Sequence, residues 1–255
     1  MQLITLNTWG GRAGNEALRQ FFRTYKDRVD VFCLQEIWSG PYEHLEGSPA
    51  GGKKIEHDEI LVHGMQERSD ILSNHAVLFH PHHLDNYGLM MAIRQDIPIQ
   101  ASGEVFVHKY KNYIPEGDIG KHARNIQHAT IGCNNKSITI INFHGLWNGQ
   151  GKTDSPDRIE QSKKILDFIR TIGGEVVLCG DFNLSPDTKS LKMFEEFGLR
   201  NLIAEYRIQS TRTSFYTKPE KFADYIFVST GIRVNSCTVI EEEVSDHAAI
   251  LLDIE

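Results

Sequence analysis

The chain lacks the features that mark membrane, disulfide-rich and zinc-binding proteins. Its four cysteines are widely spaced and form no C-x-x-C pair: Cys33, Cys133, Cys179 and Cys237. This spacing argues against both a zinc site and a disulfide framework. No run approaches the roughly 20 apolar residues of a membrane span, and the N-terminus shows no signal-peptide pattern. We therefore expect a cytoplasmic protein without a membrane anchor.

Positive charge is also scarce. The chain has 27 lysines and arginines against 34 acidic residues, a formal net charge of −7. No global positive field can hold a polyanion, so metal ions must supply much of the positive charge if the substrate is a phosphate ester. One local group of basic residues is interleaved with aromatic rings, and we call it the basic island: Arg207, Arg212, Phe215, Tyr216, Lys218 and Lys221. It could bind single-stranded nucleic acid, or it could be a solvated loop.

What the chain does have is enough apolar sequence for one large domain. With 255 residues, 40% of them hydrophobic, a single domain over 1–255 is expected. Strand patterns occupy 2–7, 30–35, 89–94, 103–108, 125–131, 136–143, 175–179, 224–228, 232–240 and 248–254. Helices are predicted from about Asn15, from Ser155-Pro156 to Gly173-Gly174, and from Ser185-Pro186 to about Gly198. The stretch 39–75 reads as a long surface excursion.

Strand–helix–strand units occur at 2–35 and at 136–179, on either side of a strand-rich middle. This alternation is typical of an α/β protein with packed sheets.

Polar residues stand at the ends of several of these strands. The strand from Val176 ends in Gly180-Asp181-Phe182-Asn183, which places a carboxylate and an amide two residues apart. Alternation along a strand puts both on one side, where they can bind water or a phosphate oxygen. An ordinary turn, in which both bond only to the backbone, is the competing interpretation. Two other strands end in Asn7 and in Gln35-Glu36, and glutamate is a good ligand for Mg²⁺.

The last strand is preceded by an acid–histidine pair, Asp246-His247. Histidine can act as a general base or bind phosphate. An acid at the start of a buried strand, Asp224, needs a partner, and pairing with His247 would fix the tautomer of the imidazole. His144 ends one more strand, although a single such histidine is usually structural. The recurrence of polar strand ends therefore points to one reaction centre.

These residues, in this order, resemble the endonuclease/exonuclease/phosphatase family. The resemblance rests on short motifs spread over nearly the whole chain: Leu6-Asn7-Thr8-Trp9, Leu34-Gln35-Glu36, Asn142-Phe143-His144-Gly145-Leu146, Gly180-Asp181-Phe182-Asn183, Asp224-Tyr225-Ile226 and Ser245-Asp246-His247. It implies a four-layer α/β sandwich, two packed mixed sheets flanked by helices, with the site at one edge.

The same resemblance implies roles for the site residues. Glu36 would be the principal Mg²⁺ (or Mn²⁺) ligand, with Asn7 and Asp246 as further ligands or as supports of the ligands. Asp181 and His247 are both candidates for activating water or stabilising the transition state. Asn183 would orient water, His144 would hold the phosphate, and Asp224 would align His247.

Further positions point to substrate binding. Arg124 begins a strand and either contacts the scissile phosphate or forms an edge-strand salt bridge. Arg158 and Gln161 match a spacing of the family that we interpret as structural support. Trp147, in a glycine-rich loop, could stack on a base or on an apolar group, and Asn148 could stand near the phosphate.

The histidine run His80-Pro81-His82-His83 is interpreted as a surface loop near the substrate, followed by Tyr87 as a possible contact. Zinc binding by the run is disfavoured, because proline and adjacency make simultaneous ligation awkward.

The leading functional hypothesis is a monomeric, metal-dependent phosphodiesterase or nuclease of DNA-repair type acting on nucleic acid. The first alternative is a phosphatase or sphingomyelinase-like phosphodiesterase that acts on a small or lipid phosphoester, because Asn7-Thr8-Trp9-Gly10 is also similar to neutral sphingomyelinases. A remote alternative is a non-catalytic binding module with the same fold.

Overall fold

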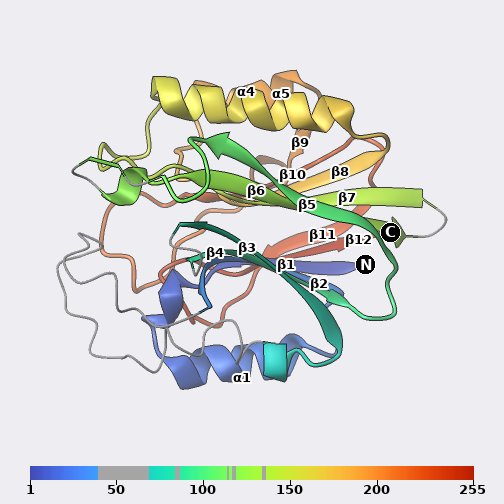
Figure 1. Cartoon of the computed structure of the whole chain (residues 1–255). Helices are drawn as coiled ribbons and strands as arrows, with labels where there is room; N and C mark the ends of the chain where they lie inside the picture. Colours follow the sequence, from blue (N-terminus) through green and yellow to red (C-terminus); the bar gives the residue numbers. More distant parts are fainter. Residues whose placement is uncertain (40–68, 84–86, 114, 117–118, 134–135) are drawn as a thin grey trace.

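The computed structural model describes residues 1–39, 69–83, 87–113, 115–116, 119–133 and 136–255. Two six-stranded sheets face each other, with strand orders β11-β12-β1-β2-β4-β3 and β5-β6-β7-β8-β10-β9. Helix α1 (Asn15–Tyr25) covers the outer face of the first sheet, and α4 (Pro156–Thr171) with α5 (Lys189–Glu196) covers the outer face of the second (Figure 1). The prediction of a four-layer α/β sandwich is confirmed.

Both sheets are mixed. The first contains β1 (Gln2–Asn7), β2 (Val31–Trp38), β3 (His75–His83), β4 (Tyr87–Arg94), β11 (Val234–Val239) and β12 (Ile250–Ile254). The second contains β5 (Ile99–His108), β6 (Arg124–Cys133), β7 (Lys136–His144), β8 (Glu175–Asp181), β9 (Arg200–Asn201) and β10 (Asp224–Val228). Strand β1 runs parallel to β2, and β7 runs parallel to β8. The described residues also include three short helical turns: η1 (Trp9–Gly11), η2 (Ile119–Lys121) and α6 (Leu202–Glu205).

Alternation along β1 and β2 divides the apolar side chains between two cores. Ile4 and Phe32 belong to the cluster that includes Phe22 of α1, whereas Leu3 and Val31 belong to the larger cluster that includes β7 and β8. Successive side chains of a strand point to opposite faces, so this division follows from the period of two. The same alternation aims the polar residues at odd positions of β1 into the space between the sheets.

A buried polar network joins the two sheets beneath one edge. Gln35 of β2 donates to Asn142 Oδ1 of β7 at 2.7 Å and to Thr5 Oγ1 of β1 at 3.2 Å. Asn142 in turn donates to the backbone oxygen of Leu34 at 3.1 Å. Buried polar groups are tolerated when their hydrogen bonds are made, and here those bonds fix the register of one sheet against the other.

The interpretation of His80–His83 as a surface loop is wrong. The run forms the second half of β3, and His82 and His83 are buried. Proline is tolerated there because β3 is the last strand of its sheet. Opposite Pro81, a Cβ on Gly88 would lie 2.3 Å from His80 O, so only glycine allows β4 to approach so closely.

One predicted helix start also shifts. Helix α5 begins at Lys189, with Thr188 at the N-cap, rather than at Ser185-Pro186. Residues 185–188 form a turn instead, and Asp154 accepts the backbone N–H groups of Lys189 and Ser190 at 2.7 and 2.9 Å. These are the N–H groups that a helix start leaves unpaired, so Asp154 stabilises the later start. Helix α1 begins at Asn15, as predicted, with Gly14 at the N-cap position.

Most of the predicted excursion 39–75 lies outside the described residues. Within the described part of the chain, no helix is both long enough and apolar enough to cross a membrane. Cys33, Cys179 and Cys237 are buried free thiols.

The supporting role of Arg158 and Gln161 is visible in the structure. Arg158 of α4 is 2% exposed and donates to the backbone oxygens of Leu146 at 3.1 Å and Gly151 at 2.8 Å, as well as to Thr153 O. Gln161 Oε1 accepts from the backbone N–H of Leu146 at 3.2 Å. Helix α4 therefore fixes the loop between β7 and α4 from inside.

Replacing Arg158 by methionine is expected to lower the free energy of unfolding by about 3 kcal/mol, because buried carbonyls lose their donors. Arg170→Met on the same helix is the matched control, since that side chain is 57% exposed and pairs with Asp167. The control should change stability by at most about 1 kcal/mol. Chemical denaturation of both variants measures the difference, and equal effects would contradict this account of Arg158.

Candidate active site

Strand ends from both sheets meet at one edge of the sandwich. Because β1 and β2 are parallel, Asn7 lies beside Gln35, and Glu36 follows. In the facing sheet, Asp181 lies between His144 of the parallel strand β7 and Asp224 of the antiparallel strand β10. The carboxyl ends of parallel strands share an edge, so the topology gathers side chains that are far apart in the sequence.

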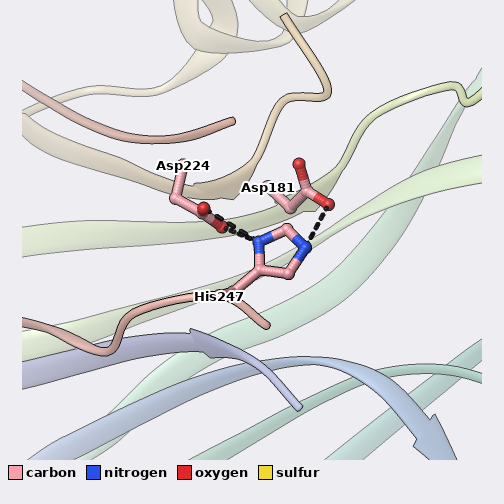
Figure 2. Close-up of side chains that lie close together, drawn as sticks. All are labelled: Asp181, Asp224 and His247. Carbon is pink, nitrogen blue, oxygen red and sulfur yellow. Dashed lines mark hydrogen bonds and ion pairs between the residues drawn. The ribbon is translucent and has the colours of Figure 1, made fainter. Parts of the chain in front are cut away.

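The centre of this edge is a carboxylate–imidazole–carboxylate chain (Figure 2). His247 Nδ1 lies 2.8 Å from both carboxylate oxygens of Asp224. Its Nε2 faces Asp181 Oδ2 at 3.6 Å. Asp224 accepts the proton of Nδ1, which fixes the ring and leaves Nε2 directed at Asp181. The predicted pairing of Asp224 with His247 is present.

Burial and neighbouring charges shift the pKa values of His247 and Asp181 in opposite directions. Burial lowers the pKa of His247, but the Asp224 carboxylate opposes burial and the pKa lies above its ordinary value. Burial raises the pKa of Asp181, yet His247, Lys152 and His144 outweigh burial and hold it well below its usual range. The site therefore favours a charged imidazolium beside an ionised carboxylate.

His144 differs from His247. Burial, followed by the charge of Arg124, lowers the pKa of His144 to about 3, so this ring is neutral at pH 7. Its Nε2 lies 3.7 Å from Asp181 Oδ2 and 3.9 Å from Glu36 Oε1. A neutral ring in this position can donate one hydrogen bond toward the space between the two carboxylates.

Asn7 links the two halves of the site. Its Nδ2 donates to Glu36 Oε1 at 3.2 Å and to Asp181 Oδ2 at 3.0 Å. Its Oδ1 accepts from the backbone N–H of Trp9 at 2.9 Å. The Asn7 amide thus holds the carboxylates of Glu36 and Asp181 close together, although their charges repel each other.

Glu36 reaches the site through a break in its strand. The pairing of β2 with β4 shifts register between Leu34 and Ile37, and Glu36 has φ of +57°. Simple alternation would turn Glu36 away from Gln35, whereas an irregularity of this kind re-aims a side chain. A non-glycine residue with positive φ stores strain and is a common feature of functional sites.

The oxygen atoms at this edge fit a hard divalent cation. Asp246 Oδ1 is buried and has no hydrogen-bond partner, while Oδ2 pairs with Arg212 at 3.2 Å. The Glu36 carboxylate is 19% exposed and its nearest cationic partner is Arg12, 3.7 Å away. Carboxylates with free oxygens are the groups that Mg²⁺ and Mn²⁺ prefer.

Asp181, Asp224 and His247 also bring one ligand atom each within 4.8 Å of one another, so this buried group could hold a metal. However, His247 Nδ1 is already bonded to Asp224. An ion bound among all three would have to break that bond. The partly exposed carboxylate of Glu36 and the buried, unbonded Oδ1 of Asp246 are therefore the better candidates for metal ligands.

Asn183 is held on both sides of its amide. Its Nδ2 donates to Gly145 O at 3.2 Å, and its Oδ1 accepts from Lys152 Nζ at 3.1 Å. Its backbone N–H donates to Asp181 Oδ1 at 2.8 Å, the turn bond expected for an Asp-x-Asn sequence. Asp181 makes this turn with one oxygen and presents the other to the site, so the two interpretations of the motif are compatible.

The predicted substrate contacts differ in their accessibility. Arg124 is 2% exposed and donates to the backbone oxygens of Gly145 at 3.1 Å and Gly120 at 3.2 Å. Strand β6 lies between β5 and β7, so the alternative of an edge-strand salt bridge is wrong. Tyr87 is buried and packs on Trp38, with ring centroids 4.4 Å apart.

The loop after β7 carries the other two predicted contacts. The half-buried Trp147 ring contacts two ammonium groups, with Lys152 Nζ 5.7 Å and Lys218 Nζ 5.5 Å from its centroid. Asn148 Oδ1 accepts from the backbone N–H of Gln150 at 3.1 Å, a local turn. Within the described chain, no hydrogen bond joins Asn148 to the catalytic side chains.

Three cations of the site were not predicted as site residues: Arg12, Lys152 and Arg212. Arg212 was assigned only to the basic island, but it pairs with Asp246 and forms an isolated β-bridge with His247. The charge of the island gave no signal for this contact. The one available signal for Lys152 was its place in a glycine-rich loop directly before the α4 helix.

Comparisons with known proteins agree with this geometry. The family model described as "Endonuclease/Exonuclease/phosphatase family" matches residues 4–247. A search of curated proteins found no match. Among solved structures, a family protein from Leptotrichia buccalis C-1013-b is similar with a TM-score of 0.71 and 19% identity, covering 100% of this chain and 99% of that one.

Two other similar structures have more specific names. The mannosyl-6-phosphatase Bt3783 of Bacteroides thetaiotaomicron VPI-5482 has a TM-score of 0.71 and 16% identity, covering 100% and 99% of the two chains. TDP2 of D. rerio complexed with a single-strand DNA product has a TM-score of 0.70 and 16% identity, covering 100% and 98%. At these identities the likeness concerns the fold alone, whereas the family model spans the chain from β1 to His247. The chain therefore belongs to the endonuclease/exonuclease/phosphatase family.

Proposed function

We propose that the protein is a divalent-metal-dependent phosphodiesterase that cleaves nucleic-acid phosphodiesters through one catalytic domain spanning 1–255. The observation that carries the proposal is the Asp224–His247–Asp181 chain beside the partly exposed carboxylate of Glu36 and the unbonded Oδ1 of Asp246. It combines an ionised carboxylate, a charged imidazole and a set of oxygen ligands at one strand edge. Water needs these groups to attack a phosphate ester. The protein would act as a cytoplasmic monomer.

Glu36 and Asp246, with Asn7 bridging to Asp181, would hold Mg²⁺ or Mn²⁺. When bound, such an ion neutralises charge on the phosphoryl oxygens. Asp181 would orient the attacking water and accept its proton, because its Oδ2 faces the site between Asn7, His144 and His247. His247 would donate from Nε2 to a phosphoryl oxygen while Asp224 keeps the ring charged. His144, neutral, would donate one further hydrogen bond, and Asn183 would fix the backbone beside Asp181.

A rim of aromatic and basic side chains supports a nucleic-acid substrate. Trp147 lies against Lys218, and Tyr216 lies under the Arg212 guanidinium at 4.1 Å from its centroid. Phe215, in the same loop as Tyr216, is 42% exposed. The rim adjoins the site because Arg212 pairs with Asp246. Aromatic faces stack on bases without regard to sequence, and flanking cations contact the phosphates. The similar TDP2 structure with single-strand DNA agrees with this assignment.

A phosphomonoester or lipid phosphoester is the second candidate substrate. The net charge of −7 favours a small substrate over a long polyanion, and one similar structure is a mannosyl-6-phosphatase. Arg124, Tyr87 and Asn148 would serve either substrate from the wall of the site.

A substrate panel tests the proposal. Short single-stranded, nicked, abasic and 5′-adducted DNAs are compared with sugar phosphates and sphingomyelin in the presence of Mg²⁺. Higher kcat/KM for the DNAs supports the nucleic-acid assignment. A preference for a sugar phosphate or for sphingomyelin would remove it and leave the second candidate.

Replacing Glu36 by glutamine is expected to weaken the affinity for Mg²⁺ by on the order of 100-fold, because a neutral amide is a much poorer ligand for a hard cation. Titration calorimetry with Mg²⁺ measures the change. Glu16→Gln is the control, since the Glu16 side chain is 71% exposed and its ion pairs among the described residues are with Arg19 and Arg23 of its own helix. Unchanged affinity in Glu36→Gln would rule out Glu36 as a principal ligand.

A further inference from the structure

Lys152 is a buried lysine with no carboxylate partner in the part of the chain that the structure describes. Its residue is 3% exposed, and its Nζ donates to Asn183 Oδ1 at 3.1 Å. Lysine is almost never fully buried unless it is paired, because removing an ammonium group from water is costly. An ammonium has three donors, so two remain after the bond to Asn183. An anion bound next to Nζ would accept these two hydrogen bonds and neutralise the charge.

The backbone around Lys152 is fixed at three consecutive residues. Arg158 donates to the oxygens of Gly151 and Thr153, and the N–H of Ser185 donates to Lys152 O at 2.7 Å. Gly151 has φ of +76°, a conformation that side chains rarely adopt. The chain therefore holds the base of this side chain rigidly, as a binding group requires.

The charged groups that act on Lys152 come from several elements. Asp181 of β8 and Asp224 of β10 attract the ammonium, whereas Arg212 and Arg158 repel it. The Trp147 ring, 5.7 Å from Nζ, covers it from the loop after β7. Burial, the largest effect, lowers the pKa of Lys152 to about 8. The group is charged at pH 7 and loses its charge as the pH rises through 8.

We propose that Lys152 is a substrate-binding residue whose ammonium group contacts the phosphoryl oxygens of the bound phosphoester. Asn183 holds the ammonium group in place, because its amide oxygen accepts a hydrogen bond from Nζ. That oxygen is therefore not free to orient water. The inference rests on the proposed hydrolysis of a phosphoester but not on the substrate's being nucleic acid. A purely structural role, in which Lys152 only supports Asn183 and Trp147, is the alternative that the test must separate.

The first test compares Lys152→Met, Lys152→Arg and the exposed control Lys163→Met on bis-p-nitrophenyl phosphate with Mg²⁺. Lys163 is 58% exposed on α4. Lys152→Met should lower kcat/KM by about 100-fold, the scale for loss of one donor to a phosphoryl group. Lys152→Arg keeps the charge and should stay within about tenfold of the wild type. A Lys152→Met protein within threefold of the wild type would overturn the proposal.

The second test compares how kcat/KM depends on pH in the wild type and in Lys152→Arg. A purely structural role of Lys152 predicts no difference between the two pH profiles. Above pH 8 the wild type loses the charge of Lys152, whereas an arginine retains it, so Lys152→Arg should lose less kcat/KM between pH 7 and 9 than the wild type. Lys152 at pH 9 is about nine-tenths uncharged if its pKa is 8, which predicts about a tenfold difference between the two losses. His247 titrates in both proteins and cancels in the comparison. Equal losses would overturn the proposal, and this readout stands even if the methionine variant fails to fold.

Binding of inorganic phosphate separates this inference from the function proposed above. Calorimetry with Mg²⁺ at pH 7 should show phosphate binding about tenfold weaker in Lys152→Met than in the wild type. Should the wild type prefer sugar phosphates to DNA, the nucleic-acid function falls while weaker phosphate binding still supports Lys152. Equal phosphate affinity in the two proteins overturns the role of Lys152 whatever the substrate.

Discussion

Replacing Asp181 by asparagine is expected to lower kcat/KM by about 10⁴-fold, the upper range for loss of a positioned general base. Asp181 is buried, it stays ionised beside His247 and Lys152, and its Oδ2 faces Asn7, His144 and His247. An asparagine keeps the shape and one oxygen but cannot accept a proton from water. Initial rates on bis-p-nitrophenyl phosphate with saturating Mg²⁺ measure the loss.

Asp187→Asn is the matched control, because Asp187 is an exposed carboxylate six residues further along the same segment. It should leave kcat/KM within twofold of the wild type. Thermal unfolding of both variants checks that the fold is retained. If Asp181→Asn retained a tenth of the wild-type activity, Asp181 would not be the group that accepts the proton of water.

The second large effect is expected for Asp224→Asn, which should lower kcat/KM by about 10³-fold at pH 7.5. Asp224 holds His247 Nδ1 at 2.8 Å and raises the pKa of His247 above its ordinary value. Without that carboxylate the ring is free to turn, and its pKa falls. Activity that requires the charged ring is present below the pKa of His247 and is lost as the pH rises through it. The alkaline limb should therefore move to lower pH in the variant.

A pH profile of kcat/KM from 5 to 9.5 for Asp224→Asn and the wild type tests this direction. His247→Gln gives the reference in which the ring is absent, and the alkaline fall that remains in its profile should be the one expected from Lys152. An unchanged or raised alkaline limb in Asp224→Asn would contradict the assignment of a charged His247.

Much of the site could be predicted from the sequence because it follows from strand order. Asn7, His144 and Asp181 each end an apolar strand, and parallel strands bring such ends to one edge. Glu36 was predicted to stand at a strand end as well, but β2 continues past it to Trp38. The motif order then indicated the family and hence the sandwich. What alternation did not predict is how Glu36 and Gln35, adjacent in β2, both reach the space between the sheets. That depends on a register shift and a positive φ, which arise only when β2 pairs with β4.

The sequence was less informative wherever burial depends on distant partners. A run of histidines and proline looks polar, so β3 was missed, although His82 packs within 5.2 Å of the Tyr87 and His122 rings. Lys152 and Arg212 look like loop charges, yet each contacts a residue more than 30 positions away. Composition cannot distinguish such cations from solvated ones. Arg124 remains a predicted phosphate contact, and its bonds to carbonyl oxygens give it a structural role as well.

The chemical roles of the strand-end residues remain predictions that rest on geometry. The rate at which EDTA-treated wild-type protein cleaves a fluorescent single-stranded oligonucleotide, measured as Mg²⁺ is restored, tests the central claim most directly. We predict no cleavage before Mg²⁺ is added, and cleavage that rises to saturation with Mg²⁺ in the wild type but not in Asp181→Asn. Cleavage that is equally fast in EDTA, or equally fast in Asp181→Asn, would contradict a metal-dependent phosphodiesterase site at this edge.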